Sequence, residues 1–341
     1  MSKTAIIIGG GVAGMETAIQ LLRLGIKVDL IEKESRLGGH LNSWDHLFPN
    51  RRDSKEVSEY LQLGMNEGIS LHLNAEIDTL WNNKEKFNIE LKDGTRLDSD
   101  ALVIATGYEV FDARKKEEYG YGIYDNVITS VELEEFLRSN ELTKLFEGKT
   151  SKRVGIIHCV GSRDEKVGNL YCSKLCCVTG VKQAIEIRER MPDTEVFCFY
   201  MDLRMFDRYF EEMYFEAQEK WGVQFIRGRL SEAAENQDHT LLIKLEDTLT
   251  GLPLKMNVGL LILLVGFVPS PETRRLASML GLKEGDDRFL CPADEHTLTN
   301  STKIPGVFLA GTVKGPEGIA GTITDARAAA LQVAAYLTSR E

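Results

Sequence analysis

The chain has 341 residues, 43% of them hydrophobic and 27% charged, which fits two domains or one domain inserted into another and excludes a disordered or fibrous protein. Its 41 basic and 52 acidic residues give a formal net charge of -11. A surface that negative repels phosphate backbones and anionic lipids, so we expect no binding to nucleic acid or to a membrane surface.

Neither a membrane span nor a signal peptide is predicted. The longest apolar run, 258–268, has 11 residues, fewer than the roughly 18 to 20 that cross a bilayer. The apolar N-terminal stretch is interrupted by glycines and followed by Glu16, without a cleavage pattern. We therefore expect a cytoplasmic protein whose six cysteines are ligands, catalytic thiols or core residues rather than disulfides.

The N-terminal 32 residues predict a β–α–β unit. Residues 4–8 and 27–32 are short runs rich in β-branched side chains, and residues 12–24 have the apolar spacing of a helix. Because the two strands are joined through a helix, this unit predicts a parallel sheet.

The next segments predict a helix and a hairpin. Residues 53–66 have an amphipathic pattern that begins at a good N-cap. Residues 87–91, a turn at 92–94 and the strand 101–105 predict a hairpin that leads back into the core.

A second α/β stretch follows. Strands are predicted at 154–159, 194–200 and 223–228. The chain then ends on a strand at 306–310, a glycine-rich turn and an alanine-rich helix at 318–337. This order of elements predicts an α/β protein.

The glycine motif Gly9-Gly10-Gly11-Val12-Ala13-Gly14 lies between the first predicted strand and helix. Gly9 permits a tight turn, Gly11 allows close approach of a pyrophosphate, and Gly14 allows the helix to pack on the strand. Glu32 ends the second strand, where a carboxylate accepts hydrogen bonds from the adenosine ribose. A chance glycine cluster is the alternative. The motif predicts a dinucleotide and leaves NAD and FAD open.

Three further segments, Gly38-Gly39, Ala105-Thr106-Gly107 and Gly306–Gly311, accompany this motif. Together they resemble the glutathione reductase and thioredoxin reductase superfamily over nearly the whole chain. The resemblance implies two Rossmann-like domains, with the second inserted into an FAD-binding fold, and a homodimer. The FAD-binding residues that it implies are Gly9, Gly11, Val12, Ala13, Gly14, Glu32, Lys33, Gly38, Gly39, Ala105, Thr106, Gly107, Gly311, Thr312, Ile319 and Ala320. Thr312 stands where that superfamily has an aspartate.

Four cysteines form a C-x12-C-x3-C-C pattern: Cys159, Cys172, Cys176 and Cys177. Four thiolates at one place match the all-cysteine ligation of a [4Fe-4S] cluster. The spacing is neither that of a zinc ribbon nor that of a ferredoxin, so a zinc site stays open. A redox dithiol of Cys172 and Cys176, or four core thiols, are the other interpretations.

The chain departs from the disulfide reductases at two places. No cysteine pair follows Gly38-Gly39, and the turn after the strand at 154–159 has no glycine-rich nicotinamide loop. Cys159 occupies that turn instead. Because the small residues that a second pyrophosphate requires are missing, we expect slow reaction with NADH or NADPH.

The motifs around the cysteines, His158–Asp164 and Tyr171–Cys177, together with Gly311–Pro316, resemble the flavoprotein A-subunit of heterodisulfide reductases. That resemblance implies FAD and one [4Fe-4S] cluster held by Cys159, Cys172, Cys176 and Cys177. It also implies that Lys182 lies near the flavin N5. The length resembles the short form of this flavoprotein in the heterodisulfide-reductase-like complexes of sulfur-oxidising bacteria, in which partner subunits carry the sulfur chemistry.

The leading hypothesis is therefore an oxidoreductase subunit that relays electrons between FAD, a cluster and partner subunits. We predict an FAD-binding domain from residues 1–110 and 258–341, with an inserted domain at 111–257 that carries the cysteines. One alternative is an NAD(P)H-dependent, thioredoxin-reductase-like disulfide oxidoreductase that uses Cys172 and Cys176. The other is a non-catalytic scaffold stabilised by FAD or zinc.

Overall fold

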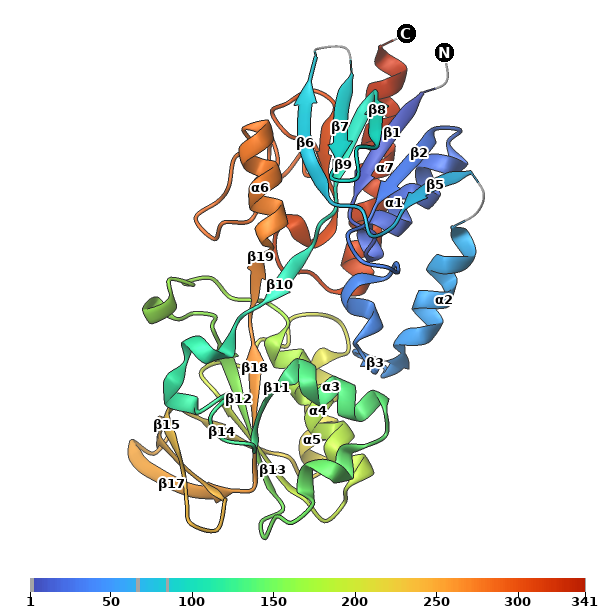
Figure 1. The fold of residues 1–341 in the computed structure, drawn as a ribbon. Helices are drawn as coiled ribbons and strands as arrows, with labels where there is room; N and C mark the ends of the chain where they lie inside the picture. Colours follow the sequence, from blue (N-terminus) through green and yellow to red (C-terminus); the bar gives the residue numbers. More distant parts are fainter. Residues whose placement is uncertain (1–2, 66–67, 84–85, 341) are drawn as a thin grey trace. The chain divides into compact units, whose positions relative to one another are not determined.

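The computed structural model describes residues 3–65, 68–83 and 86–340 (Figure 1). The chain forms two compact units, each built on a five-stranded parallel sheet. Unit 1 comprises the residues up to Asn42, Lys55–Glu109 and the residues from Val268 onward, and unit 2 comprises Ser43–Ser54 and Val110–Phe267. This arrangement confirms the predicted α/β fold with two Rossmann-like domains.

The units divide the chain differently from the predicted domains at two places. Residues 43–54 belong to unit 2, although residues on both sides of them belong to unit 1. Strand β18 (Leu260–Val265), predicted to open the last part of the FAD-binding domain, lies in unit 2. It pairs with β11 (Val127–Thr129) and β12 (Arg153–Val160), and an all-apolar strand does not show from its sequence which sheet it enters.

The sheet of unit 1 has the strand order β20-β9-β1-β2-β5. Alternate side chains of the central strands enter two different cores. Ala5 and Ile7 of β1 contact the helix side, with residues of α1 and α7, whereas Ile6 and Ile8 join a core with Phe87. The elements are β1 (Thr4–Ile8), α1 (Val12–Arg23), β2 (Lys27–Ile31), β5 (Ile69–His72), β9 (Ala101–Ile104), β20 (Val307–Leu309) and α7 (Ile319–Ser339).

A three-stranded antiparallel sheet contributes to the second core of unit 1. It consists of β6 (Ile77–Asn82), β7 (Phe87–Leu91) and β8 (Arg96–Ser99). The predicted hairpin was therefore wrong in its second strand, because β7 pairs with β8. Strand β9, the predicted partner, instead pairs in parallel with β1 and β20. Four consecutive buried residues in β9 suit a central parallel strand better than an exposed hairpin.

The sheet of unit 2 has the order β11-β18-β12-β13-β14. Strand β12 lies between β13 (Glu195–Tyr200) and β18, so its carboxyl end is at the place where the strand order reverses. Helix α4 (Cys176–Arg190) follows β12 in the chain. Ligands of doubly wound sheets bind at this reversal, and β1 has the same position between β2 and β9 in unit 1.

The remaining elements complete the two units. A second three-stranded antiparallel sheet, β15-β16-β17, belongs to unit 2. Sequence analysis did not predict this sheet. These elements are η1 (Gly39–Asn42), β3 (His46–Leu47), β4 (Arg52–Asp53), α2 (Ser54–Gly64), β10 (Tyr108–Val110), η2 (Ala113–Lys115), η3 (Glu117–Tyr119), α3 (Ser130–Arg138), η4 (Leu142–Phe146), η5 (Glu165–Val167), α5 (Phe210–Glu219), β14 (Gln224–Arg227), β15 (Leu230–Glu235), β16 (Leu241–Asp247), β17 (Leu252–Val258), β19 (Phe267–Pro269), α6 (Pro271–Leu280) and η6 (Gly311–Lys314).

Helix α7 shows how small side chains permit close helix packing. Its alanines Ala326, Ala329 and Ala330 are fully buried in the core that also contains Ala18 and Leu21 of α1. Such small residues let two helix backbones approach each other and the sheet closely. Within the described ranges 3–65, 68–83 and 86–340, no helix has both the length and the hydropathy needed to cross a membrane.

Candidate functional site

The turn between β1 and α1 is tightly packed at two of its glycines. Gly9 adopts φ +106°, and a Cβ there would lie 2.4 Å from the carbonyl oxygen of Ala105. A Cβ at Gly14 would lie 1.8 Å from the carbonyl oxygen of Gly9. Both positions exclude a side chain because the helix packs directly on the end of the strand.

Gly11 is different, because a Cβ there would meet no heavy atom within 4 Å. Gly11 is the N-cap of α1 and provides no side-chain hydrogen bond to the amides of the first helical turn, which belong to Val12, Ala13 and Gly14. Open space in front of an uncapped helix N-terminus suits the pyrophosphate of a dinucleotide. The turn therefore fits the predicted ligand.

Glu32 lies directly after β2 and is 7% exposed. Its Oε2 accepts a hydrogen bond from the Gly10 amide at 2.6 Å, and its Oε1 accepts one from the Glu34 amide at 2.8 Å. These two bonds fix the carboxylate, while each oxygen keeps a lone pair for a further donor. This geometry fits a ribose acceptor. Lys33 is exposed, and its Nζ lies 4.0 Å from the Glu34 carboxylate.

The Gly38-Gly39 pair packs against the glycine motif between β1 and α1. The Gly38 amide donates to the Gly10 carbonyl oxygen at 2.8 Å, and Gly38 forms a single parallel bridge with Gly11. A Cβ at Gly39 would lie 3.3 Å from the Gly11 Cα. The two glycine segments, separate in the sequence, thus form one backbone surface.

The segment after β9 reaches the same edge of the sheet. The Thr106 hydroxyl lies 2.6 Å from the Thr273 hydroxyl. Gly107 has φ +69°, and a Cβ there would lie 3.6 Å from the Thr312 Oγ1. The structure therefore brings Thr312 beside Gly107, as a common site in unit 1 requires.

Near the C-terminus, the Gly311 amide donates to Asp325 Oδ2 at 2.6 Å, and Lys314 Nζ donates to Asp325 Oδ1 at 2.5 Å. Sequence analysis missed Asp325. Its only signal was a single acidic residue in an alanine-rich helix. Its carboxylate belongs to a side chain from α7 and holds the Gly311 amide and Lys314 next to Thr312.

The predicted residues Ile319 and Ala320 are the first two residues of α7. Their N-cap, Gly318, provides no side-chain hydrogen bond. The first-turn amides of α7 are thus, like those of α1, without a side-chain cap, and the positive end of the helix dipole favours a negative group there.

The structure groups the four predicted cluster cysteines at the carboxyl end of β12. Cys159 has φ +62° at an irregularity in the pairing of β12 with β18. Cys172 is half-buried in the following loop, and Cys176 and Cys177 are the first residues of α4. The pKa of the Cys176 thiol is raised well above its usual range, first by burial and then by the neighbouring Cys159, Cys177 and Cys172.

These thiols are poorly suited to dithiol chemistry. Burial, with smaller contributions from neighbouring thiols, raises the pKa of Cys159 to about 12, and Cys176 is 7% exposed. A nucleophilic dithiol needs a thiol with a lowered pKa. The burial of Cys176 and its raised pKa therefore argue against Cys176 as the nucleophile of a Cys172/Cys176 redox pair.

The donor set fits an anionic metal cluster better. The Lys174 amide donates to Cys172 Sγ at 3.3 Å, and the Arg204 amide donates to Cys177 and lowers its pKa against the larger effect of burial. Leu175, the N-cap of α4, provides no side-chain bond, so the helix dipole can favour negative sulfur at Cys176 and Cys177. Four cysteines with amide donors fit the ligation of a [4Fe-4S] cluster.

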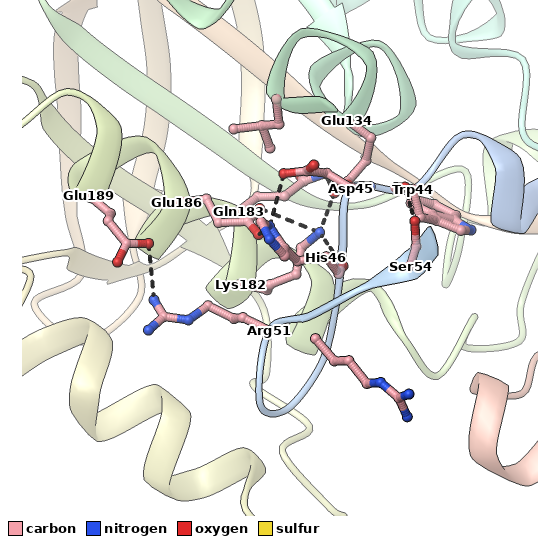
Figure 2. A network of polar contacts seen from close by, with 12 residues as sticks. Trp44, Asp45, His46, Arg51, Ser54, Glu134, Lys182, Gln183, Glu186 and Glu189 are labelled. Carbon is pink, nitrogen blue, oxygen red and sulfur yellow. Dashed lines mark hydrogen bonds and ion pairs between the residues drawn. The ribbon is translucent and has the colours of Figure 1, made fainter. Parts of the chain in front are cut away.

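Lys182 lies in a different polar network of unit 2 (Figure 2). It is 1% exposed. Its Nζ donates to the His46 carbonyl oxygen at 2.9 Å and to Glu134 Oε1 at 2.6 Å, and lies 3.4 Å from Glu186 Oε2. Burial alone would lower the pKa of Lys182, but the two carboxylates outweigh it and raise the pKa. Two hydrogen bonds and one ion pair thus hold the ammonium group, and its predicted place near a flavin stays a prediction.

The same network anchors Ser43–Ser54, which we call the strap. His46 Nδ1 lies 2.9 Å from Asp45 Oδ2 and 3.1 Å from Glu186 Oε1, and Arg190 also pairs with Asp45. The atoms that Asp45, His46 and Glu186 could offer to a metal ion as ligands lie within 4.8 Å of one another. Because Arg190 and Lys182 already neutralise the carboxylates, the arrangement favours a proton on His46 over a metal ion. Sequence analysis missed this network.

Residues 1–146 match the family model described as "Pyridine nucleotide-disulphide oxidoreductase". The match indicates FAD binding.

Relatives of known name match nearly the whole chain. The A-subunit of the "H(2):CoB-CoM heterodisulfide,ferredoxin reductase" of Methanothermobacter thermautotrophicus is 32% identical over 99% of this chain and 64% of its own length. The iron-sulfur A-subunit of the "CoB--CoM heterodisulfide reductase" of Methanocaldococcus jannaschii is 31% identical over 98% of this chain and 64% of its own length. The chain thus spans less than two thirds of these relatives.

Solved structures show the same fold. The thioredoxin reductase of T. acidophilum covers all of this chain with a TM-score of 0.68 at 20% identity, and all of that chain is matched. The "NAD-Dependent Persulfide Reductase" of A. fulgidus matches 97% of this chain and 59% of its own, with a TM-score of 0.60 at 16% identity. At these identities the likeness shows the fold.

Proposed function

We propose that this chain is the FAD- and [4Fe-4S]-containing electron-transfer subunit of a heterodisulfide-reductase-like complex, because heterodisulfide reductase A-subunits match nearly its whole length at 31–32% identity. The grouping of Cys159, Cys172, Cys176 and Cys177 at the carboxyl end of β12 carries the proposal. Its relatives are oxidoreductases by name, and one of them is named as an iron-sulfur subunit.

In unit 1, the chain's own groups would hold FAD from several directions. The uncapped amides after Gly11 would bind the pyrophosphate, and the Glu32 carboxylate would accept the ribose hydroxyl groups. The first-turn amides of α7 and the Thr312 hydroxyl provide donors for the remaining polar groups. When bound, FAD supplies one- and two-electron redox chemistry, and the cluster supplies one-electron chemistry.

In unit 2, four thiols would each bind one iron atom after losing their protons. Burial works against that loss in the free protein, because it raises the pKa of Cys159 and Cys176. The positive charge of the iron overcomes this effect, so cluster binding releases protons and is weaker at low pH. The amides of Lys174 and Arg204 then stabilise negative charge on Cys172 and Cys177.

Direct reduction by NADH or NADPH is unfavourable in this arrangement. The carboxyl end of β12, where a second nucleotide would bind a Rossmann sheet, contains Cys159 and leads into the long connection 161–175 rather than into a short glycine turn. Without amides to hold its pyrophosphate, a nicotinamide cannot keep the short, aligned approach that hydride transfer needs. Electrons would instead pass between the cluster and partner subunits.

We also propose partner subunits, an oligomeric state and a cellular compartment for this chain. Disulfide or sulfane chemistry would belong to partner subunits in sulfur metabolism, and the chain itself would form a homodimer. All six cysteines are free, which suits a reducing compartment such as the cytoplasm.

Anaerobic purification of the full chain tests the proposal. We expect about four iron and four acid-labile sulfide atoms per chain, and acid precipitation should release intact FAD. In stopped-flow experiments, millimolar NADH should reduce the flavin far more slowly than dithionite does, and partner subunits should accelerate the exchange. Zinc in place of iron would support the scaffold alternative, and rapid saturable reduction by NADH without iron would support the thioredoxin-reductase-like one.

A further inference from the structure

Arg163 lies in the loop between the first two cluster cysteines, and its backbone is held in place. It adopts φ +52°, and its amide donates to the Tyr171 carbonyl oxygen at 2.9 Å. The next residue, Asp164, exchanges backbone hydrogen bonds of 2.8 and 3.1 Å with Asn169. Such bonds fix the direction in which the Cα–Cβ bond of Arg163 leaves the backbone.

Ion pairs of the neighbouring Asp164 also hold the loop that carries Arg163. The Asp164 carboxylate, 2% exposed, accepts from Lys116 Nζ at 2.6 Å and from Arg229 Nη2 at 2.6 Å. Lys116 is also 2% exposed. Because breaking a buried pair is costly, the loop that carries Arg163 has little freedom to move away from the cysteines.

The two ends of the Arg163 guanidinium have different surroundings. Nη2 donates to Asp202 Oδ2 at 2.7 Å, whereas Nη1 is buried and has no hydrogen-bond partner among the described residues. Buried charged donors normally have an acceptor, so Nη1 marks a place where an acceptor belongs. A neutral thiol accepts weakly, but anionic sulfur accepts well.

The Arg163 guanidinium also interacts with the cysteines. It interacts with Cys159 through its charge and a side-chain hydrogen bond, and its charge also acts on Cys177 and Cys172. One guanidinium therefore acts on three of the four predicted ligands, and it also pairs with Asp202.

We propose that Arg163 is a positioning residue for the cluster, whose buried Nη1 donates a hydrogen bond to anionic sulfur and whose fixed charge raises the cluster's reduction potential. This inference rests on the proposed [4Fe-4S] site. Taking up one electron makes a four-thiolate cluster more negative by one charge and changes no covalent bond. A fixed neighbouring cation and a hydrogen bond to sulfur both favour the more negative form.

The test is an EPR-monitored redox titration of the full chain, purified anaerobically, with iron content measured on the same samples. We expect Arg163→Gln to retain its iron and to bind the electron at least tenfold more weakly, a lowering of about 59 mV for a one-electron couple. Arg163→Lys, which keeps the charge, should recover part of this loss.

Arg227 provides the matched control. Its Nη2 lies 3.5 Å from the same Asp202 carboxylate, and its side chain is 47% exposed. Arg227→Gln therefore removes the same charge from the same ion pair on the solvent side, and it should change the electron affinity less than threefold. Equal shifts for Arg163→Gln and Arg227→Gln, or no shift in either, would overturn the inference.

If Arg163→Gln loses its iron, Asp202→Asn decides the question. This variant keeps Arg163 and removes the carboxylate that offsets its charge, so the potential should rise, and an unchanged or lowered potential contradicts the inference. A wild-type protein without iron would instead remove the proposed function itself, which separates the two failures.

Discussion

The two units use the same position of a parallel sheet in opposite ways. In unit 1, residues 9–11 join β1 to α1, and the turn is so short that Gly9 and Gly14 exclude any side chain. In unit 2, residues 161–175 join β12 to α4, and the connection carries the half-buried thiol of Cys172 and the buried carboxylate of Asp164, which pairs with Lys116. A short glycine turn exposes helix amides to a phosphate, whereas a long connection fills that space with side chains that can bind metal.

The largest effect is expected for substitutions that remove a predicted cluster ligand from unit 2. Cys159→Ala and Cys176→Ala should each lose or convert the cluster, because each removes one of four ligands. Iron content and the EPR signal measure the outcome. Cys198→Ala is the matched control, since Cys198 is fully buried in β13, and burial, with a smaller contribution from the neighbouring Cys177, raises its pKa. A Cys198→Ala protein without iron, or a Cys176→Ala protein with its full cluster, would contradict the ligand assignment.

Two glycine substitutions separate folding from binding in unit 1. Gly14→Ala places a Cβ 1.8 Å from a carbonyl oxygen, so it should destabilise the protein by about 1 to 3 kcal/mol, as overpacking does. Gly11→Ala meets no atom within 4 Å and should change stability by less than about 0.5 kcal/mol. It should nevertheless weaken FAD binding at least tenfold, because the added methyl group occupies the space for the pyrophosphate. Thermal unfolding of the apoprotein and flavin titration distinguish the two effects.

A change at Glu32 should have a more moderate effect. Glu32→Gln leaves one acceptor oxygen and removes the charge, so we expect FAD to bind more weakly by about 1 to 3 kcal/mol. Part of this loss would be indirect, because glutamine can accept with only one oxygen and so cannot hold both the Gly10 and the Glu34 amide as the wild-type carboxylate does. Flavin titration by fluorescence quenching gives the affinity. The same affinity in wild type and variant would exclude the ribose contact.

The smallest expected effect concerns the strap, which belongs to unit 2 but is continuous with unit 1. The hydrogen bond to Glu186 raises the pKa of His46, and the charge of Asp45 raises it further, against desolvation and the opposing charge of Arg190. Lys182 and Glu134 face the same network. A raised pKa in the folded state means that the stabilisation is complete below the unfolded-state pKa of about 6.5. It is lost as the pH rises through the raised value.

Hydrogen exchange of the strap amides, corrected for intrinsic rates, measures this effect. Opening of the strap should be more favourable above the raised pKa than at pH 6, by about 0.2 to 1 kcal/mol for such a partly exposed pair. His46→Gln should remove the difference. If the protection of the strap is independent of pH in wild type, His46 does not titrate against these carboxylates.

The sequence by itself determined the local elements and the chemistry that they carry. The glycine motif with Glu32 predicted the β1–α1 turn, and the spacing of Cys159, Cys172, Cys176 and Cys177 predicted a cysteine group, because both depend on neighbours in the chain. Which sheet β18 enters, the pairing of β7 with β8, and the docking of the strap on Lys182 were decided only by tertiary structure. The same is true of Asp325 at Gly311 and of the unpartnered Nη1 of Arg163. In each case a polar or apolar group finds its partner far away in the sequence, and burial of the pair, rather than any local pattern, decides the arrangement.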